Sequence, residues 1–355
     1  MNRLFGIALI VVTSQVAWGQ QSAPDTARVT NVKRYPDHLF IWPVIKQRSL
    51  NFEVQKRNDD KDFLSFKPNS TVSMGVGLYV FEVGVELALA VPIDEKSRAQ
   101  YGTSDVHDLQ GQIVGRGLAL DFFTQRYSGF YLSNPSSIKK NDPYPQRPDL
   151  TLKNTGVSGL YVFNRKKMSL KSAFNFAERQ LRSGGSWVLA GTFNSVRLFS
   201  DSTLVGPALQ RRLKLDKTFD DIHYTTLSLA PGYAYNLIYK NWFVNLTLSV
   251  GPAHHWVSFN DAAGKPHYDI AINSFVDSRL ALGYNSDRWF GGIGFISQAR
   301  EVRFADFQFT TTTTSFKMLV GYRILEKGIF KKRAIDYVPV FGPKGITSLG
   351  SRSSR

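Results

Sequence analysis

Apolar residues occupy every second position between Lys67 and Pro92, in the stretch KPNSTVSMGVGLYVFEVGVELALAVP. This period of two is typical of a β-strand with one apolar face. The opposite face carries small residues and two carboxylates, Glu82 and Glu86, so it borders water or a polar interior. The apolar face therefore belongs either to the core of a soluble sheet protein or to a surface in contact with lipid.

The same alternation recurs along most of the chain. Candidate strands cover 72–80, 81–91, 110–122, 125–133, 155–163, 167–176, 186–199, 223–236, 241–258, 269–284, 288–303 and 309–324. Several exceed the roughly 5–6 residues of soluble strands and match the roughly 9–11 residues that cross a bilayer at a tilt. No window holds the roughly eighteen apolar residues of a spanning helix. We therefore predict an all-β fold, a transmembrane antiparallel up-and-down β-barrel.

The connections between these strands are of two kinds. Short ones are expected at 79–81, 124–126, 164–167 and 285–287, and long polar ones at 93–109 and 133–154. Tight turns on one side and longer loops on the other are characteristic of outer-membrane barrels. The strands ending near Phe199 and starting near His223 would point the same way, so a crossing is missing from this count. A further strand at 49–57 is possible, and we predict about 12–14 strands, since bacterial barrels use even numbers.

Aromatic residues cluster beside the expected tight turns, where a barrel meets the boundary between lipid and water. Rings with one polar edge favour that boundary. The predicted interface girdle consists of Tyr79, Phe81, Phe122, Tyr127, Tyr161, Phe163, Tyr235, Trp242, Tyr284 and Trp289. A soluble sandwich would instead place such rings in the middle of its core.

The N-terminal residues 1–19 are typical of a cleaved secretory signal peptide, with Arg3, a short apolar stretch and a small-x-small site at Ala17–Gly19. We expect periplasmic extensions at 20–48 and 331–355, on either side of a barrel at 49–330. The chain contains no cysteine, which excludes a lipoprotein anchor, disulfides and thiolate metal sites. The predicted location is the cell outer membrane.

The chain carries a formal net charge of +16. In an exported protein this surplus fits anionic lipid head groups or anionic solutes better than nucleic acid. We expect the partners to be outer-membrane lipids, lipopolysaccharide and the barrel-assembly machinery. We also expect a monomer without a cofactor.

Charged residues on the polar faces of the strands are expected to line the lumen, because a charge facing hydrocarbon is costly. The candidates are Glu82, Glu86, Asp121, Lys171, Asp277, Arg279, Lys317 and Arg323. They could select solutes, or they could form an ion-paired network that holds a narrow barrel together.

Catalytic residues are not evident in the sequence. His254 and His255 with Ser258 and Asp261 contain the ingredients of a hydrolase. However, adjacent residues of a strand point to opposite faces, so both histidines cannot join one triad. We therefore expect no enzyme, and a structural barrel or a passive porin-like channel. The alternatives are a lipid-modifying outer-membrane hydrolase and a secreted soluble β-protein that binds glycans.

Several motifs resemble one known family. They are Lys67-Pro68-Asn69 before Met74–Gly77; Thr124–Tyr127 with Gly129–Leu132; Tyr161–Asn164 with Lys166-Lys167; Glu178–Gln180 with Ser183–Ser186; Pro231–Tyr233 with Lys240–Phe243; and Gly321–Arg323. Together they resemble the Bacteroidota outer-membrane barrels known as domain of unknown function 4421. The resemblance implies a fold and a location, and it brings no substrate or catalytic residue with it.

Overall fold

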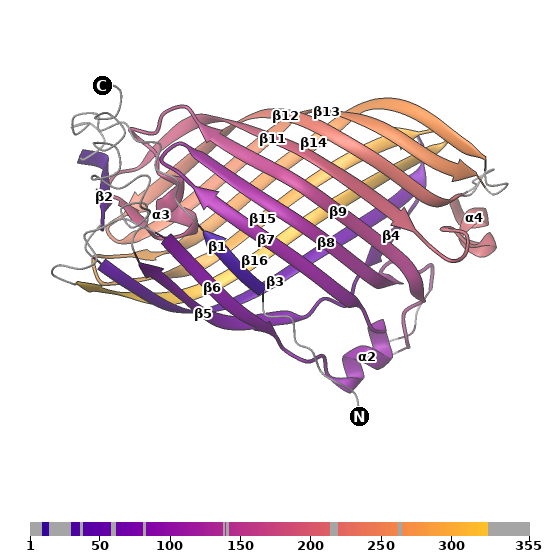
Figure 1. The fold of residues 1–355 in the computed structure, drawn as a ribbon, viewed down its shortest axis with the longest axis horizontal. Coiled ribbons are helices and arrows are strands. Elements are labelled where there is room, and N and C mark those ends of the chain that lie inside the picture. The colour runs from indigo at the N-terminus through magenta and orange to yellow at the C-terminus, as the bar shows by residue number, and fades with distance from the viewer. Residues whose placement is uncertain are drawn as a thin grey trace, which may run out of the picture.

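Long antiparallel strands wrap around a central axis in the computed structural model (Figure 1). It describes residues 9–13, 30–35, 38–57, 62–80, 83–137, 139, 142–213, 219–261 and 265–325. One sheet contains fourteen strands, and β2 and β10 form a second, two-stranded sheet. The predicted all-β antiparallel barrel is confirmed.

The elements follow one another in a simple order along the chain. The strands are β1 (Leu9–Thr13), β2 (Val32–Arg34), β3 (His38–Lys56), β4 (Phe63–Lys67), β5 (Val72–Val80), β6 (Val83–Ala90), β7 (Asp105–Val114), β8 (Leu118–Leu132), β9 (Gln146–Val162), β10 (Glu178–Gln180), β11 (Gly184–Phe199), β12 (Phe219–Tyr239), β13 (Trp242–Asp261), β14 (Pro266–Asn285), β15 (Trp289–Phe304) and β16 (Phe307–Leu325). The helices are α2 (Glu95–Tyr101), α3 (Leu170–Phe174) and α4 (Pro207–Leu213).

Ten of these strands close a ring, in the order β3, β16, β15, β14, β13, β12, β11, β9, β8 and β4. The short strand β4 closes it, because Phe66 pairs with Phe52 of β3 on one side and with Leu132 of β8 on the other. Beside β4 the wall is continued by β5 and β6, which extend from β3, and by β7, which extends from β8.

The wall has one place where two neighbouring long strands do not pair. Within the described residues β6 and β7 share no ladder, and β1 pairs with β6 at this position, with Leu9 opposite Ala88. Strand β1 lies inside the stretch 1–19 predicted to be a cleaved signal peptide. Its removal, which remains a prediction, would leave the edge of β6 without this partner.

The two ends of the barrel differ. At the end called here the turn end, strands are joined by the short connections Val80–Val83, Val114–Leu118, Tyr239–Trp242 and Asn285–Trp289. At the opposite, loop end the chain makes longer excursions, including those that contain α2 and α4. Figure 1 places α3 and β2 at the turn end and α4 at the loop end.

The outer surface of the barrel is apolar, as the alternation predicts. Exposed apolar side chains on the opening stretch are Met74, Val76, Leu78, Val85, Leu87 and Leu89, and those on β13 are Val244, Leu246, Leu248 and Val250. Their inward neighbours Asn245, Thr247 and Ser249 are fully buried. The apolar face of these strands is therefore on the outside of the ring, where hydrocarbon can cover it.

Most of the predicted girdle lies on this outer surface. Phe122, Tyr161, Phe163, Tyr235, Trp242 and Trp289 are exposed, and Tyr284 is half-buried. Tyr79 and Tyr127 were wrongly assigned to the girdle and are buried inside the barrel. Alternation explains both errors, because each shares a strand face with lumen residues, Tyr127 with Gln125 for example. Phe81 lies outside the described residues.

Several predicted boundaries need correction. Strand β3 (His38–Lys56) covers all but the last residue of the possible strand 49–57 and begins within the stretch 20–48 assigned to an extension. Strand β8 runs through 124–126 without a turn, and β9 starts inside the expected loop 133–154. The segment 167–176 was expected to be a strand, but it contains α3. These changes remove the parity conflict, because β11 and β12 are now joined at the loop end as an ordinary antiparallel pair.

No helix in the described part of the chain has the length and apolar character to cross a membrane.

An arginine on the outer surface should destabilise the barrel according to its depth. Val250→Arg, in the middle of the apolar band of β13, should lower the free energy of unfolding by about 2–4 kcal/mol, because a charge enters hydrocarbon. Tyr239→Arg, beside the turn between β12 and β13, should cost about 1 kcal/mol or less. Urea unfolding in lipid vesicles measures both. Equal costs at the two positions would contradict the membrane assignment of this surface.

Candidate functional site

The lumen is divided into three layers along the barrel axis. An apolar core fills the loop end, polar and charged side chains occupy the middle, and a folded insertion closes the turn end. The sequence analysis expected charged residues in the lumen and did not anticipate the apolar filling of the loop end.

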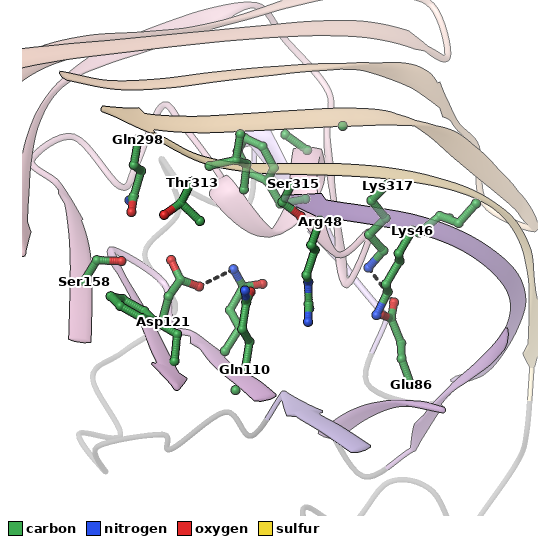
Figure 2. Close-up of a pocket in the computed structure, with 18 of the residues that line it drawn as sticks. Lys46, Arg48, Glu86, Gln110, Asp121, Ser158, Gln298, Thr313, Ser315 and Lys317 are labelled. Atoms are coloured by element: carbon green, nitrogen blue, oxygen red, sulfur yellow. Dashed lines mark hydrogen bonds and ion pairs between the residues drawn. The ribbon is translucent and has the colours of Figure 1, made fainter. Parts of the chain in front are cut away.

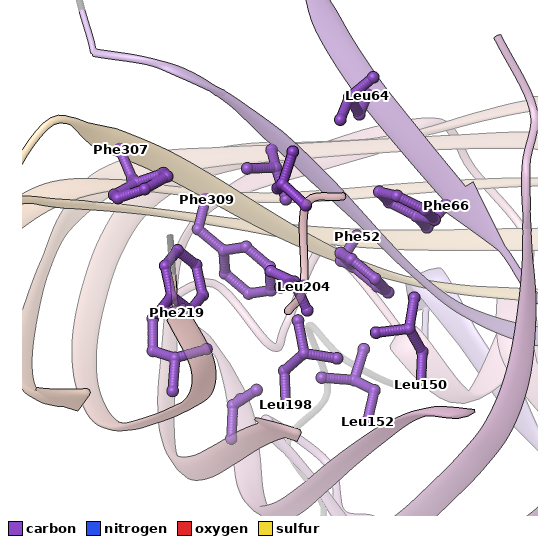
Figure 3. Packing of buried hydrophobic residues seen from close by; sticks show 14 of the residues in the cluster. Phe52, Leu64, Phe66, Leu150, Leu152, Leu198, Leu204, Phe219, Phe307 and Phe309 are labelled. Atoms are coloured by element: carbon purple, nitrogen blue, oxygen red, sulfur yellow. The ribbon is translucent and has the colours of Figure 1, made fainter. Parts of the chain in front are cut away.

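The apolar core at the loop end draws on most strands of the ring (Figure 3). It includes Leu50, Phe52, Val54, Leu64, Phe66, Leu150, Leu152, Leu198, Leu204, Phe219, Phe307 and Phe309, all with 0–2% of their surface exposed. Phe52 stacks on Phe66 with ring centroids 4.9 Å apart, and Phe219 meets Phe307 edge-on at 4.7 Å. Among the described residues, such close packing fills this end of the lumen with apolar side chains.

The insertion between β9 and β11, called here the plug (163–183), closes the turn end. It contains α3 and β10, and β10 pairs with β2. Apolar and polar contacts both attach it to the wall. Met168 and Leu170 belong to one buried apolar cluster with wall residues, and Ala173 and Phe176 belong to another. Ser169 Oγ donates to Glu178 Oε2 at 2.6 Å within the plug, and Asn236 Nδ2 of the wall donates to Gln180 Oε1 at 2.6 Å. Asn285 Nδ2 of the wall donates to the Glu178 carbonyl at 3.1 Å.

Arg323 fastens the plug to the wall. Its Nη2 donates to the Phe176 carbonyl at 2.7 Å and to Asn285 Oδ1 at 2.8 Å. Its guanidinium lies over the rings of Tyr35 and Phe290, 4.2 and 4.7 Å from their centroids. Arg323 thus closes the turn end and does not line a passage.

The turn outside this closure carries an ion pair with an unusually acidic carboxyl. Lys33 Nζ lies 2.8 Å from Asp287 Oδ1, and Arg179 Nη1 donates to the same oxygen at 2.9 Å. The hydrogen bond from Lys33 lowers the pKa of Asp287 to about 2. Asp287 therefore stays charged at neutral pH and ties β2 and the plug to the turn between β14 and β15.

A buried polar network crosses the middle layer. Arg279 Nε donates to Asp277 Oδ1 at 2.9 Å, and Gln298 Nε2 donates to Asp277 Oδ2 at 2.7 Å. Arg300 Nη2 continues the chain to Gln298 Oε1 at 3.0 Å. Arg279 Nη2 also lies 3.7 Å from Asp121 Oδ2. These contacts connect several strands through the interior.

A second network centres on Glu86. This carboxylate, 5% exposed, accepts hydrogen bonds from both Lys46 and Lys317, so strands β3, β6 and β16 meet at one charge. Trp42 Nε1 donates to the same group at 2.9 Å. The Trp42 ring lies against Gly77, where any side chain would overlap it. Glu86 therefore holds two ammonium groups together in the lumen.

A cavity of about 150 Å³ lies between these two networks (Figure 2). Its lining includes Lys46, Arg48, Glu86, Gln110, Asp121, Ser158, Gln298, Thr313, Ser315 and Lys317. A neighbouring cavity of about 340 Å³ shares Lys46, Arg48 and Gln125 and reaches Ala88 on β6 and Val106 on β7. It therefore extends to the place where the wall lacks a direct ladder.

Arg48 lies between the two networks, with its guanidinium directed into the cavity (Figure 2). Its Nε and Nη1 are buried, and neither donates a hydrogen bond to a described residue. Nη1 lies 3.7 Å from Asp108 Oδ1, too far for a hydrogen bond. Asp108 Oδ2 is already bonded to Gln125 and Tyr127. Arg48 is thus a largely enclosed cation with two buried donors that make no hydrogen bond to a described residue. The sequence analysis missed it because the expected strand 49–57 began after Arg48, whereas β3 starts at His38.

The structure places the predicted lumen charges in three situations. Glu86, Asp121 and Lys317 line the cavity, and Asp277 and Arg279 lie beside it. Lys171 is buried in α3 of the plug, and Arg323 holds the plug. Glu82 lies outside the described residues.

The hydrolase ingredients at His254–Asp261 are not assembled. His255 is buried in the lumen and bonds Thr226 Oγ1 through Nδ1 at 2.8 Å, whereas Ser258 Oγ donates to the His223 carbonyl at 3.4 Å. A different pair, Ser195 Oγ and His223 Nε2, lies 2.8 Å apart on the outer surface. The carboxylate nearest to it in sequence, Asp221, is bonded to Arg197 instead. Among the described residues no three His, Cys, Asp or Glu are grouped so that they could hold a metal ion.

This fold, with an apolar outer surface and a charged interior, defines the class of outer-membrane-type β-barrels. The chain belongs to the family described as Domain of unknown function (DUF4421), whose model matches residues 24–324. The resemblance of the sequence motifs to this family is confirmed. No match is found among curated proteins.

Solved structures with similar folds include three outer-membrane barrels. The outer membrane protease OmpT from Escherichia coli is 6% identical, with 82% of this chain and 98% of that chain covered and a TM-score of 0.38. The translocator domain of the autotransporter NalP from Neisseria meningitidis is 8% identical, with 81% and 88% covered and a TM-score of 0.30. The toluene transporter TodX of Pseudomonas putida is 9% identical, with 86% and 94% covered and a TM-score of 0.21.

Removing the shared carboxylate should destabilise the lumen. Glu86→Gln leaves the ammonium groups of Lys46 and Lys317 together without their counter-charge, so the free energy of unfolding should fall by about 3 kcal/mol. Adding Lys317→Gln should restore part of this loss, because one of the two stranded charges is gone. Urea unfolding in lipid vesicles of the wild type, the two single variants and the double variant measures these changes.

The matched control is Glu301→Gln, which removes the carboxylate of the partly exposed pair with Arg303. It should cost about 1 kcal/mol or less. If Glu86→Gln is as mild as this control, Glu86 is not the centre of the network.

Proposed function

We propose that this protein is a transport-type barrel of the outer membrane whose lumen is closed at both ends and binds a small anion in the central cavity. Arg48 is the observation that carries the proposal. Buried guanidinium donors that make no hydrogen bond, such as its Nε and Nη1, are costly, and a carboxylate or phosphate can accept two hydrogen bonds from a guanidinium at once. Lys46 and Lys317 add positive charge to the same lining.

The location follows from the outer surface and the predicted leader. Exposed apolar side chains occur on strands around the ring, such as Leu78, Leu246 and Met318, which supports a membrane protein over the secreted soluble alternative. A signal peptide at 1–19 would export the chain, and the turn end would face the periplasm, as short turns do in bacterial barrels.

Closure at both ends argues against free diffusion along the axis. The apolar core at the loop end is tightly packed and draws on the strands themselves. The plug is attached by side-chain hydrogen bonds, such as those of Asn236, Asn285 and Arg323, and by apolar packing, such as that of Phe176 on Phe290. Hydrogen bonds of this kind contribute about 1 kcal/mol each. No described strand of the plug pairs with the ring, so the plug can move without breaking a ladder of the wall.

Planar-bilayer recordings test the closed state. The wild-type barrel should show no steady conductance. Replacing Lys171–Gln180 with a Gly/Ser linker of equal length should produce one, because the turn end loses its closure. The same replacement of Glu95–Tyr101 in α2, outside the lumen, is the control and should remain silent. A steady porin-like conductance of the wild type would contradict the proposal.

Calorimetry on the detergent-solubilised protein tests the anion site. Inorganic phosphate or acetate should bind to the wild type, and Arg48→Gln should weaken binding about tenfold or more, since charge-assisted hydrogen bonds are lost. Arg211→Gln, an equal charge change at the exposed surface of α4, should leave the affinity unchanged. If neither anion binds, or if the two variants behave alike, the cavity is not an anion site.

A further inference from the structure

A row of basic residues crosses the outer surface near the loop end. Its members are Arg126 on β8, Lys153 on β9, Arg197 on β11 and His223 on β12, called here the basic row. Each member is the direct cross-strand partner of the next. All four side chains point outward and are exposed. Direct partners in a sheet have Cβ atoms roughly 5 Å apart, so the row brings three cationic side chains and one imidazole together in one continuous patch.

The protein itself neutralises only part of this row. Asp221 forms two hydrogen bonds with Arg197, at 2.6 and 3.1 Å. Lys153 Nζ and the Arg197 guanidinium lie over the Phe199 ring, 5.3 and 5.4 Å from its centroid. Among the described residues, neither Arg126 nor Lys153 has a carboxylate partner. Like charges placed directly opposite each other destabilise a sheet, so the row is costly unless an anion covers it.

Toward the middle of the barrel, the outward-facing residues change from charged to hydroxyl-bearing and then to apolar. One outward position closer to the barrel's middle, the same four strands carry Thr124, Thr155, Ser195 and Thr225. The next outward position in the same direction carries Phe122, Val157, Phe193 and Leu227. Each strand therefore passes from an apolar residue through a hydroxyl to a cation or imidazole. A phosphorylated lipid passes in the same order from acyl chains through ester and hydroxyl groups to phosphate.

The hydroxyls of the intermediate row are ordered. Thr124 Oγ1 and Thr155 Oγ1 lie 3.0 Å apart, and Ser195 Oγ lies 2.8 Å from His223 Nε2. The pair of Ser195 and His223 thus belongs to a polar surface that is continuous with the basic row. This surface is local, because the next strand, β13, places Ser258 opposite His223, and β14 follows with Tyr268. The turn end of the same strands is lined instead by rings such as Tyr161 and Trp187.

From this arrangement we infer that the basic row binds the phosphate groups of a phosphorylated lipid in the leaflet around the loop end, with its acyl chains against Phe122, Phe193 and Leu227. Arginine and lysine supply the donors that phosphate oxygens accept. The apolar residues select a lipid over a soluble phosphate, because a soluble phosphate cannot cover them. The site is on the outer surface and is independent of the cavity at Arg48.

The test compares lipid retention by purified protein in a neutral detergent. The probe is dioleoyl phosphatidic acid, compared with dioleoyl phosphatidylcholine, and bound lipid is counted by native mass spectrometry. The wild type should retain phosphatidic acid preferentially. The double variant Arg126→Gln/Lys153→Gln should lower its retention about tenfold or more, since each basic residue near a membrane surface contributes to anionic-lipid binding. This variant leaves the pair of Arg197 and Asp221 intact.

The matched control is Lys67→Gln/Lys96→Gln, which removes two exposed charges from β4 and α2 and should retain phosphatidic acid like the wild type. Glycerol phosphate, which lacks acyl chains, should not displace the lipid. No preference for phosphatidic acid in the wild type, equal loss in the control, or displacement by glycerol phosphate would each overturn the inference.

Stability in two environments separates binding from a structural role. In neutral detergent Arg126→Gln/Lys153→Gln should unfold no more easily than the wild type, because repulsion within the row is relieved. In vesicles that contain phosphatidic acid the wild type should be the more stable of the two, because the lipid binds only the folded barrel. A variant that is equally destabilised in both environments would show that the row serves folding alone.

Discussion

The structure depends on one constraint, that a sheet in hydrocarbon must satisfy its backbone hydrogen bonds within itself and turn apolar side chains outward. Antiparallel ladders close a ring through β4, and period-two alternation then divides every strand between lipid and lumen. On β13 the outward residues from Val244 to Val250 are apolar, and the inward residues between them are polar and buried. The same alternation that makes the outer surface apolar therefore brings polar and charged groups together inside.

The lumen is occupied at both ends by packed side chains. An apolar core at the loop end resembles the interior of a soluble protein, and the plug closes the turn end. Between these closures, Glu86, Asp277 and their charged partners satisfy one another. Arg48 differs from them because its donors remain unused. The interior is thus both a structural network and a candidate site, the two roles that the sequence left open.

Local patterning was sufficient to predict the barrel, the outward face of β13 and the inward direction of the Glu86 side chain, because alternation depends only on neighbours in the chain. It failed at 167–176, where the apolar residues belong to the plug helix α3 and not to a strand. It also failed where contacts join distant segments. Arg48 and Lys317 share a cavity only after β16 pairs with β3, and Arg126 meets Lys153 only once the register of β8 and β9 is set. Contacts between distant segments cannot be predicted from the periodicity of the sequence.

Fluorescence of single tryptophans in bilayers of brominated lipid tests the central claim most directly. In variants that keep one native tryptophan each, the exposed Trp187 or Trp242 should be strongly quenched by the lipid, and the buried Trp42 should not. Trp42 donates to Glu86 inside the lumen, so it reports on the interior of the same ring. Equal quenching of Trp42 and Trp242 would contradict a barrel with lipid outside and charge within.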